Sequence, residues 1–235
     1  MKPVKRSLAI AAALSLLLPA AAFAQEAEEA SSPISWELAV TNDYVFRGLS
    51  QTDEGPAFQA GLTYTTPVGI YAGVWGSNVD FGPGDPDFEV DAFVGYNVDF
   101  NDSLNFDILF NRYGYPKAGA SNYNELIAAL TFAETYSVSV AYTDDVFNSS
   151  TDSWYYSLGA SWGLPADFTL DVSAGVTEFE DGTVGRDYKD WSVGIGKSFG
   201  PLTVSAAYVG TDGKGRDAYG YIADNRLVVT LSVGQ

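Results

Sequence analysis

The stretch 88–100 constrains the fold of this chain more than any other feature, because its side chains alternate between two kinds. It reads FEVDAFVGYNVDF: the even positions are apolar and the odd positions are polar or small, with Phe93 as the exception. Successive side chains of a strand point to opposite faces, so the stretch predicts a strand with one apolar and one polar side. Its length and its aromatic ends are typical of a transmembrane β-barrel strand.

Similar strand-like segments recur along the chain. We expect about twelve, at residues 36–46, 58–64, 71–81, 88–100, 104–113, 124–132, 136–143, 154–162, 168–179, 188–199, 202–209 and 227–233. The alternation is poor in 71–81, where the pattern places Tyr71, Trp75 and Val79 outward and Asn78 and Asp80 inward.

The connections between these segments alternate in length. Short ones lie at 67–69, 101–103, 133–135, 164–167 and 200–201, and longer ones, rich in turn residues, lie at 48–56, 82–87, 114–121, 144–152, 180–187 and 210–225. This alternation is typical of outer-membrane barrels, with short periplasmic turns and long extracellular loops. The sequence therefore predicts an all-β fold, a transmembrane antiparallel up-and-down β-barrel of about 12 strands over residues 34–235.

A soluble sandwich or a lipocalin-like barrel, with the apolar face inside, is the alternative architecture. Two features favour the membrane barrel. The polar face has scarcely any Lys, whereas a soluble exterior carries mixed charge. Aromatic residues also gather near the strand ends, as they do where a lipid-facing band meets water.

The N-terminus has the pattern of an export signal. Lys2, Lys5 and Arg6 precede an apolar stretch at 8–18, and 22–24 (AFA) is a small-x-small cleavage site. We expect a signal peptide over 1–24, cut near Ala24, and export to the outer membrane of a Gram-negative bacterium; a short membrane anchor is the alternative. Residues 25–33 (QEAEEASSP) are acidic and aperiodic, which favours a flexible periplasmic tail over a strap or plug inside the barrel.

Composition excludes several classes of function. The chain has 12 Lys and Arg and 30 Asp and Glu, so without the three bases of the signal peptide nine bases face 30 acids, a formal charge of −21. This charge disfavours nucleic acid and anionic membrane surfaces as partners. The sequence contains neither His nor Cys, so His-dependent hydrolysis, Cys nucleophiles and Cys/His zinc sites are excluded. No pair of carboxylates stands out as a catalytic pair; we therefore expect no enzyme and no cofactor.

Three stretches in the first third resemble the TorF-type porin family of Gram-negative outer-membrane proteins. They are 40–52 (VTNDYVFRGLSQT), 55–64 (GPAFQAGLTY) and 69–81 (GIYAGVWGSNVDF). The resemblance implies an outer-membrane barrel with the function of a porin, and it implies no catalytic residue. Many such barrels end on an aromatic residue, whereas this sequence ends on LSVGQ.

Charged residues on the inward parity are the candidates for a selective lumen. They are Glu37, Asp43, Arg47, Glu89, Asp91, Asp107, Glu125, Asp171 and Asp190. Rings of carboxylates give a pore a negative potential, so one interpretation is a lumen that favours cations. The other is that these acids pair with bases and brace a closed interior; for Arg47 we expect a fork to Asp43 or Glu89.

A second group of acids lies in the long connections. It comprises Asp85, Asp87, Asp144, Asp145, Asp181, Asp187, Asp212 and Asp217. Solvated loop charge is the favoured interpretation, and a divalent-ion site is the alternative. The glycine-rich stretch 213–220 (GKGRDAYG) lacks the context of a phosphate-binding loop, so we expect a flexible extracellular loop there.

The sequence thus predicts a passive channel for small polar solutes with a cation-leaning, acidic lumen. A closed barrel whose extracellular loops carry a structural or surface-interaction role is the alternative. The expected partners are outer-membrane lipid, small polar solutes or cations, and the barrel-assembly machinery.

Overall fold

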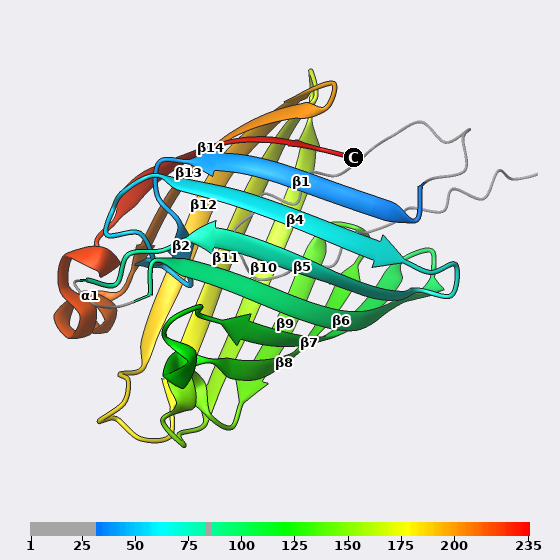
Figure 1. Cartoon of the computed structure of the whole chain (residues 1–235). Coiled ribbons are helices and arrows are strands. Elements are labelled where there is room, and N and C mark those ends of the chain that lie inside the picture. Colours follow the sequence, from blue (N-terminus) through cyan, green and yellow to red (C-terminus); the bar gives the residue numbers. More distant parts are fainter. Residues whose placement is uncertain (1–31, 83–85) are drawn as a thin grey trace, which may run out of the picture.

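Twelve strands close into a single barrel in the computed structural model, which describes residues 32–82 and 86–235 (Figure 1). The predicted signal peptide and residues 25–31 of the predicted tail lie outside these ranges. The barrel strands are β1 (Ile34–Thr41), β4 (Ala57–Thr65), β5 (Ile70–Asn78), β6 (Phe88–Asn101), β7 (Leu104–Gly114), β8 (Tyr123–Phe132), β9 (Tyr136–Thr143), β10 (Ser153–Leu164), β11 (Phe168–Phe179), β12 (Tyr188–Phe199), β13 (Leu202–Thr211) and β14 (Arg226–Gly234).

Each barrel strand pairs antiparallel with its neighbours in the chain, and β1 closes the barrel by pairing with both β4 and β14. Closure leaves no sheet edge. The backbone N–H and C=O groups of an open edge would have no hydrogen-bond partner in an apolar environment. This confirms the predicted fold class. Among the residues that the structure describes, no helix is both long and apolar enough to span a membrane.

Short and long connections alternate as the sequence predicts, and they define the two ends of the barrel. The long-loop end carries the 3-10 helices η1 (Gly119–Ser121), η2 (Val146–Asn148) and η3 (Gly220–Ala223) and the helix α1 (Gly213–Tyr219) (Figure 1). The opposite, short-turn end uses left-handed backbone for its tight reversals, as at Ala133 and Glu134 (φ 51° and 55°). Consecutive left-handed residues match the twist of a hairpin.

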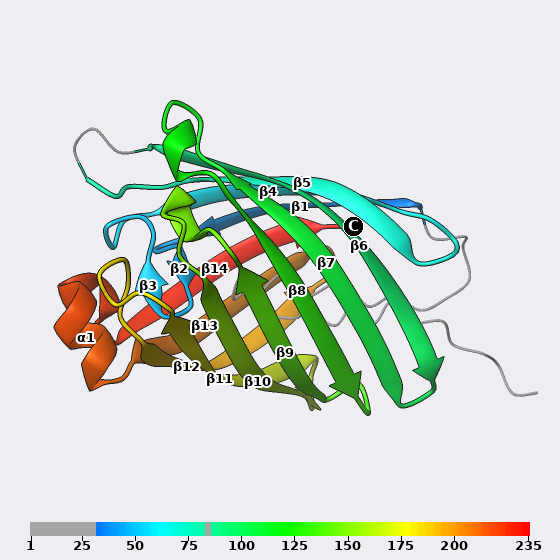
Figure 2. The ribbon, with the colours of Figure 1, turned by 90° about the horizontal axis from the view of Figure 1, so that it is seen from below.

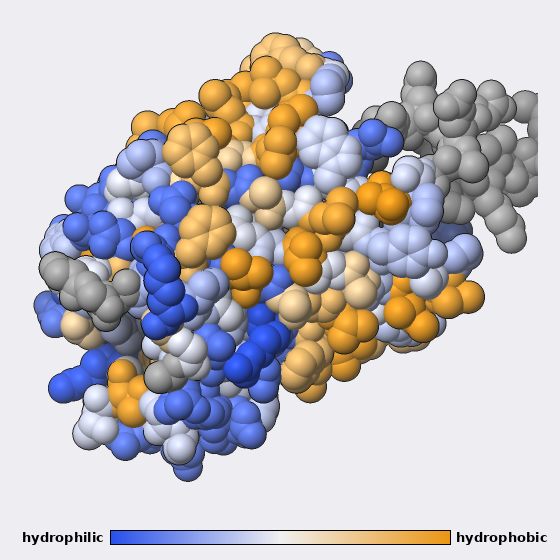
Figure 3. All heavy atoms as spheres, in the orientation of Figure 1, coloured by the Kyte–Doolittle hydropathy of each residue, from blue (hydrophilic) through white to orange (hydrophobic). Residues whose placement is uncertain are grey.

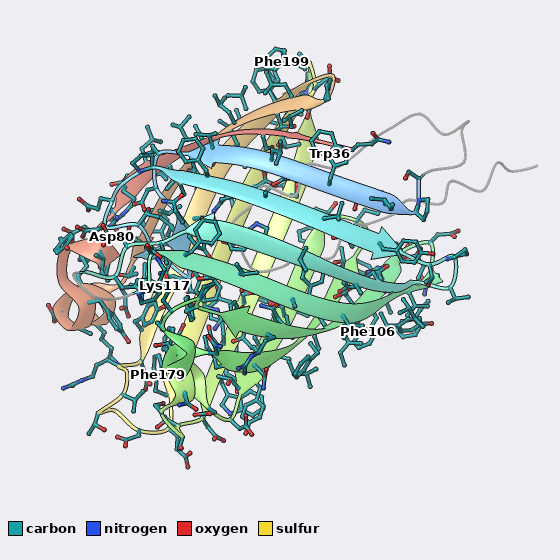
Figure 4. All side chains as sticks on the ribbon, in the orientation of Figure 1. Trp36, Asp80, Phe106, Lys117, Phe179 and Phe199 are labelled. Carbon is teal, nitrogen blue, oxygen red and sulfur yellow. The ribbon has the colours of Figure 1, made fainter. Side chains whose placement is uncertain are left out.

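Apolar side chains cover the outside of the barrel, and the interior holds polar side chains together with a buried cluster that includes Leu109 and Ile127. In β6, Val90 and Val94 are exposed on the outside, whereas Glu89 and Asp91 are buried inside. Figure 3 shows hydrophobic residues over the strands and hydrophilic residues gathered at the long-loop end. Outward aromatic rings lie near both ends, among them Phe132 and Phe199 by the short turns and Phe58 by the long loops. Figure 4 places Phe199 at the end opposite Asp80, Lys117 and Phe179.

The predicted facing of β5 is wrong. Tyr71, Trp75 and Val79 are buried rather than lipid-facing (4%, 7% and 4% exposed). Asn78 points outward, where its side chain accepts a hydrogen bond from the backbone N–H of Phe58 and donates one to the carbonyl of Pro56. The reason lies in the neighbouring strands, where Gly61 and Gly95 stand beside the two inward rings in the register and make room for them. Large rings opposite glycines fill a barrel interior, so ring size alone does not reveal the facing.

Two predicted boundaries also differ. The first strand ends at Thr41 rather than at residue 46, because residues 42–56 leave the barrel wall. The stretch 213–220, predicted as a flexible loop, forms α1 instead. Asp212 caps this helix, since its side chain accepts a hydrogen bond from the backbone N–H of Gly215 at 2.9 Å.

Candidate functional site

The connection between β1 and β4 folds into the barrel rather than away from it. Within this inward hairpin (residues 42–56), β2 (Val45–Phe46) pairs with β3 (Leu49–Ser50). Figure 2 shows both strands between the walls of the barrel at the long-loop end. Tyr44 packs edge-on against Trp75 of β5, with ring centroids 5.5 Å apart. The hairpin thereby occupies the interior at this end.

Arg47, at the tip of the hairpin, forms a buried ion pair with the barrel wall. Its Nη2 atom lies 2.9 and 2.8 Å from the two carboxylate oxygens of Glu125 in β8. The two side chains are only 7% and 2% exposed. Tyr113 of β7 donates a further hydrogen bond to Glu125 at 3.0 Å. The expected partners Asp43 and Glu89 are therefore wrong, since the hairpin carries Arg47 across to the far wall.

The guanidinium of Arg47 is also enclosed by aromatic rings. It lies 4.2 Å from the ring centroid of Tyr155 in β10 and 4.6 Å from that of Phe46. Burial lowers the pKa of Arg47, whereas the negative charge of Glu125 raises it. The net result is a pKa above the ordinary value of arginine. Arg47 therefore stays charged inside the barrel.

The tip of the hairpin fits closely against the opposite wall because residue 48 is glycine. Gly48 has a φ of 80°, a conformation that L side chains rarely adopt. A Cβ atom added there would lie 2.7 Å from Cγ2 of Thr211 and 2.8 Å from Cβ of Asp190. The tip thus spans the interior, from Glu125 on one side to β12 and β13 on the other.

The base of the hairpin is tied to the barrel rim. Asp43 accepts hydrogen bonds from Ser50 at 2.6 Å and from Thr52 at 3.1 Å within the hairpin. Arg226, at the start of β14, lies 2.7 Å from Asp43 and 3.3 Å from Glu54. Both ends of the hairpin are therefore held by ion pairs.

The remaining acids of the long-loop half are buried and hydrogen-bonded. Glu89 accepts a hydrogen bond from Tyr44 at 3.1 Å, and Asp190 accepts one from Tyr155 at 3.2 Å. Asp91 accepts one from Asn111 at 3.1 Å. The first of these contacts links the hairpin to the wall, and the other two join wall strands to one another.

Several buried polar atoms at this level have no partner among the described residues. They are Nε of Arg47, Oδ1 of Asp91, Oδ1 of Asn111, Oγ1 of Thr177 and Oδ2 of Asp190.

Other predicted site residues lie closer to the short-turn end. Asp107 accepts a hydrogen bond from Tyr71 at 2.9 Å and is 8% exposed. Glu37 and Asp171 are half-buried on the interior side of their strands. The structure therefore brings Asp43, Arg47, Glu89, Asp91, Glu125 and Asp190 together around the hairpin. It leaves Glu37, Asp107 and Asp171 apart from them.

Sequence reasoning missed the tyrosines and Arg226 as members of this site. Tyr113 shares the inward parity of Asp107 in β7, so the alternation itself contained that signal. Arg226 precedes the predicted strand 227–233, and nothing in its local sequence indicates a partner 183 residues away.

The loop acids do not gather into an ion site where they are described. Within residues 32–82 and 86–235, no group of three or more His, Cys, Asp or Glu side chains could hold a metal ion. Asp87 instead forms an exposed ion pair with Lys117 at 3.3 Å. Asp85 lies outside the described residues, so a contribution from it stays untested.

The barrel is similar to solved porin structures at low sequence identity. It matches the KdgM porin with a TM-score of 0.55 and 9% identity, covering 85% of this chain and 98% of that one. It matches the NanC porin with a TM-score of 0.53 and 11% identity, covering 86% and 97%. A further KdgM structure, in complex with disordered oligogalacturonate, matches with a TM-score of 0.50 and 8% identity, covering 86% and 95%. At these identities the likeness concerns the fold.

No curated protein sequence matches the chain. A family model does match it, over residues 26–233, and its description is "Bacterial protein of unknown function (Gcw_chp)". The match does not carry the TorF name, so that resemblance stays a prediction. Because the match extends over nearly the whole chain, this protein belongs to the Gcw_chp family of bacterial proteins.

Proposed function

We propose that the protein is an outer-membrane channel for the passive diffusion of small polar solutes. The observation that carries the proposal is the distribution of side chains, which is the reverse of that in a soluble barrel. Exposed apolar side chains lie outside, and polar, acidic side chains lie inside. An exterior of this kind suits lipid, and a polar interior suits hydrated solutes. The porins that share the fold support the same function.

A preference for cations follows from the interior charges. The carboxylates of Glu37, Asp107 and Asp171 face the interior away from the hairpin, and within the described ranges no salt bridge involves them. Low-dielectric walls focus the field of such charges into the lumen. The oligogalacturonate in one KdgM structure is an anion, and the acidic interior of this chain disfavours a ligand of that charge.

The inward hairpin favours a second candidate function, a closed barrel with a structural or surface role. Glu89, Asp91 and Glu125 are at most 2% exposed, so little solvent reaches the wall beside the hairpin. In this alternative the ion pairs brace the interior, and the loops carry the function.

Planar-bilayer recording separates the two functions. The channel predicts discrete conductance steps and a reversal potential of cationic sign under a salt gradient. The triple variant Glu37→Gln, Asp107→Asn and Asp171→Asn should move that potential toward zero. The control Asp144→Asn with Asp145→Asn should move it less, because water screens charges on the loops. Absence of conductance from correctly folded protein would favour the closed barrel.

Location and partners are tested by fractionation. We expect export through a signal peptide cut near Ala24, insertion by the barrel-assembly machinery, and recovery with the outer membrane. The folded barrel should migrate differently in detergent gels before and after boiling. A soluble periplasmic pool of folded protein would contradict the proposal.

A further inference from the structure

The surroundings of Arg47 have the composition of a binding site for an organic cation. One wall offers the Glu125 carboxylate at 2.8 Å, and another offers the face of Tyr155 at 4.2 Å. A carboxylate combined with an aromatic face is the general chemistry that binds guanidinium and ammonium groups. Here the cation is part of the same chain.

Glu125 and Tyr155 belong to the barrel wall, and the hairpin adds the ring of Phe46 to the site. Tyr113 of β7 holds Glu125 of β8, and the Tyr155 hydroxyl of β10 is hydrogen-bonded to Asp190 of β12. Strands β7 and β8 pair directly, and β11 pairs with both β10 and β12, so the barrel wall fixes the positions of these side chains. Arg47 comes instead from a two-residue turn between two short strands. Without Arg47 the wall would therefore keep its groups in place.

The buried carboxylate of Glu125 has its counter-ion in Arg47. Glu89, Asp91, Glu125 and Asp190 all lie on the wall beside the hairpin, and Arg47 is the base that the hairpin brings among them. Oδ2 of Asp190 and Oδ1 of Asp91 are buried without a partner among the described residues. Removing one partner of a buried ion pair is strongly unfavourable, so withdrawal of Arg47 would leave the Glu125 carboxylate in need of another cation.

We propose that Arg47 occupies a recognition site for cationic solutes bearing a guanidinium or alkylammonium group, and that the hairpin competes with those solutes for it. The inference rests on the proposed channel function and deepens it, because it names the substrate class. A solute that reaches Glu125 and Tyr155 displaces Arg47 and carries the compensating charge itself. The same displacement loosens the hairpin that fills the long-loop half.

Methylguanidinium is the probe for a first test that does not depend on conductance. In the folded, detergent-solubilised Arg47→Ala variant, millimolar methylguanidinium should raise the thermal unfolding temperature. The double variant Arg47→Ala with Glu125→Gln keeps the vacant space and lacks the carboxylate, so it should show no such rise. Equal responses of the two variants would overturn the proposal. Different gel migration with and without boiling verifies that each variant is folded.

Channel block gives the second test. Methylguanidinium should block current through Arg47→Ala at a concentration roughly tenfold below that for the wild-type chain, the factor expected for one charge-assisted hydrogen bond. Arg47→Lys, which retains the tethered cation, should behave like the wild type. If Arg47→Ala and the wild type are blocked equally, the inference is wrong. If no variant conducts but methylguanidinium still stabilises Arg47→Ala, the channel function fails and the cation site stands.

A third test restores a positive charge at residue 47, and it applies also when Arg47→Ala fails to fold. It asks whether a tethered cation and methylguanidinium compete for the same site. The chain has no Cys, so Arg47→Cys provides a single thiol. Its thiolate attacks aminoethyl methanethiosulfonate, forming a disulfide and releasing methanesulfinate, which places an ammonium group on the side chain. This modification should remove the response to methylguanidinium, and the neutral methyl methanethiosulfonate should leave it in place. The same response after both reagents would overturn the proposal.

Discussion

Tyr71 and Asp107 are joined along the inner face of the barrel wall by a hydrogen bond, with the phenol donating to Oδ1 of the carboxylate at 2.9 Å. The contact runs from β5 to β7 and passes over β6, where Gly95 pairs with Tyr71 in the register. A Cβ atom added at Gly95 would overlap Cζ and Oη of Tyr71. The absence of a side chain on one strand thus allows a ring on the next strand to reach a carboxylate beyond it.

Gly95→Ala should destabilise the barrel by about 1–3 kcal/mol, because the ring of Tyr71 must leave its position. In a Tyr71→Ala background the same change should cost less, because the ring atoms that the methyl group meets are gone, although the carbonyl oxygen of Ile108 stays 2.8 Å from the added Cβ. Urea unfolding of the two single variants and the double variant in lipid vesicles measures this coupling. Additive costs would show that the two residues do not share the space.

Arg226→Ala should destabilise the protein by about 3–5 kcal/mol, because it leaves Asp43 buried beside no base. Arg226 is 10% exposed and lies 2.7 Å from a carboxylate that is itself 2% exposed. Arg112→Ala is the matched control: that side chain is exposed and donates to the neutral Asn124 at 3.1 Å. Equilibrium unfolding should show a small effect for the control, and similar losses for both variants would contradict the role of Arg226.

Substitutions on the two faces of one strand should differ in cost. Val138→Arg places a charge on the exterior, where it should cost about 2–4 kcal/mol near the midplane of a bilayer. Ser139→Arg should cost much less, because Ser139 faces the polar interior, where it is hydrogen-bonded to Ser157 at 2.6 Å. Val172→Arg and Ser173→Arg repeat the comparison in β11. Folding yields into vesicles give the difference, and equal yields for both faces would mean that lipid does not surround this band.

Asp171→Asn should reduce cation preference if the barrel conducts. Asp171 is half-buried on the interior side of β11, and its charge acts on solutes within the Debye length, about 10 Å at 0.1 M salt. The shift in reversal potential should therefore be largest in dilute electrolyte. Asp181→Asn is the control, because hydrogen bonds from Thr183 lower the pKa of Asp181, which stays charged but lies in an exposed loop. A larger shift for Asp181→Asn would locate selectivity in the loops.

Alternation along the chain determined the barrel, because a strand with a strict period of two can bury only one of its faces. In β6, β9 and β11 the sequence alone separated the exterior from the interior, and connection lengths separated the two ends. Where bulky rings lie opposite glycines, as with Tyr71 and Gly95, the period gave the wrong side. Packing against the neighbouring strand decided which face of the strand carries the ring. The sequence of the segment itself does not show which strand that neighbour is.

Only the tertiary structure decided what the charged interior does. The sequence placed Glu125 and Asp190 on the inward parity, but the predicted partner of Arg47 was Asp43 or Glu89, because guanidinium geometry suits carboxylates. The hairpin turns inward at Gly48 and carries Arg47 to Glu125, 78 residues away. An ion pair inside a closed barrel depends on which strands face each other across the interior. The local sequence pattern contains no information on that arrangement of strands.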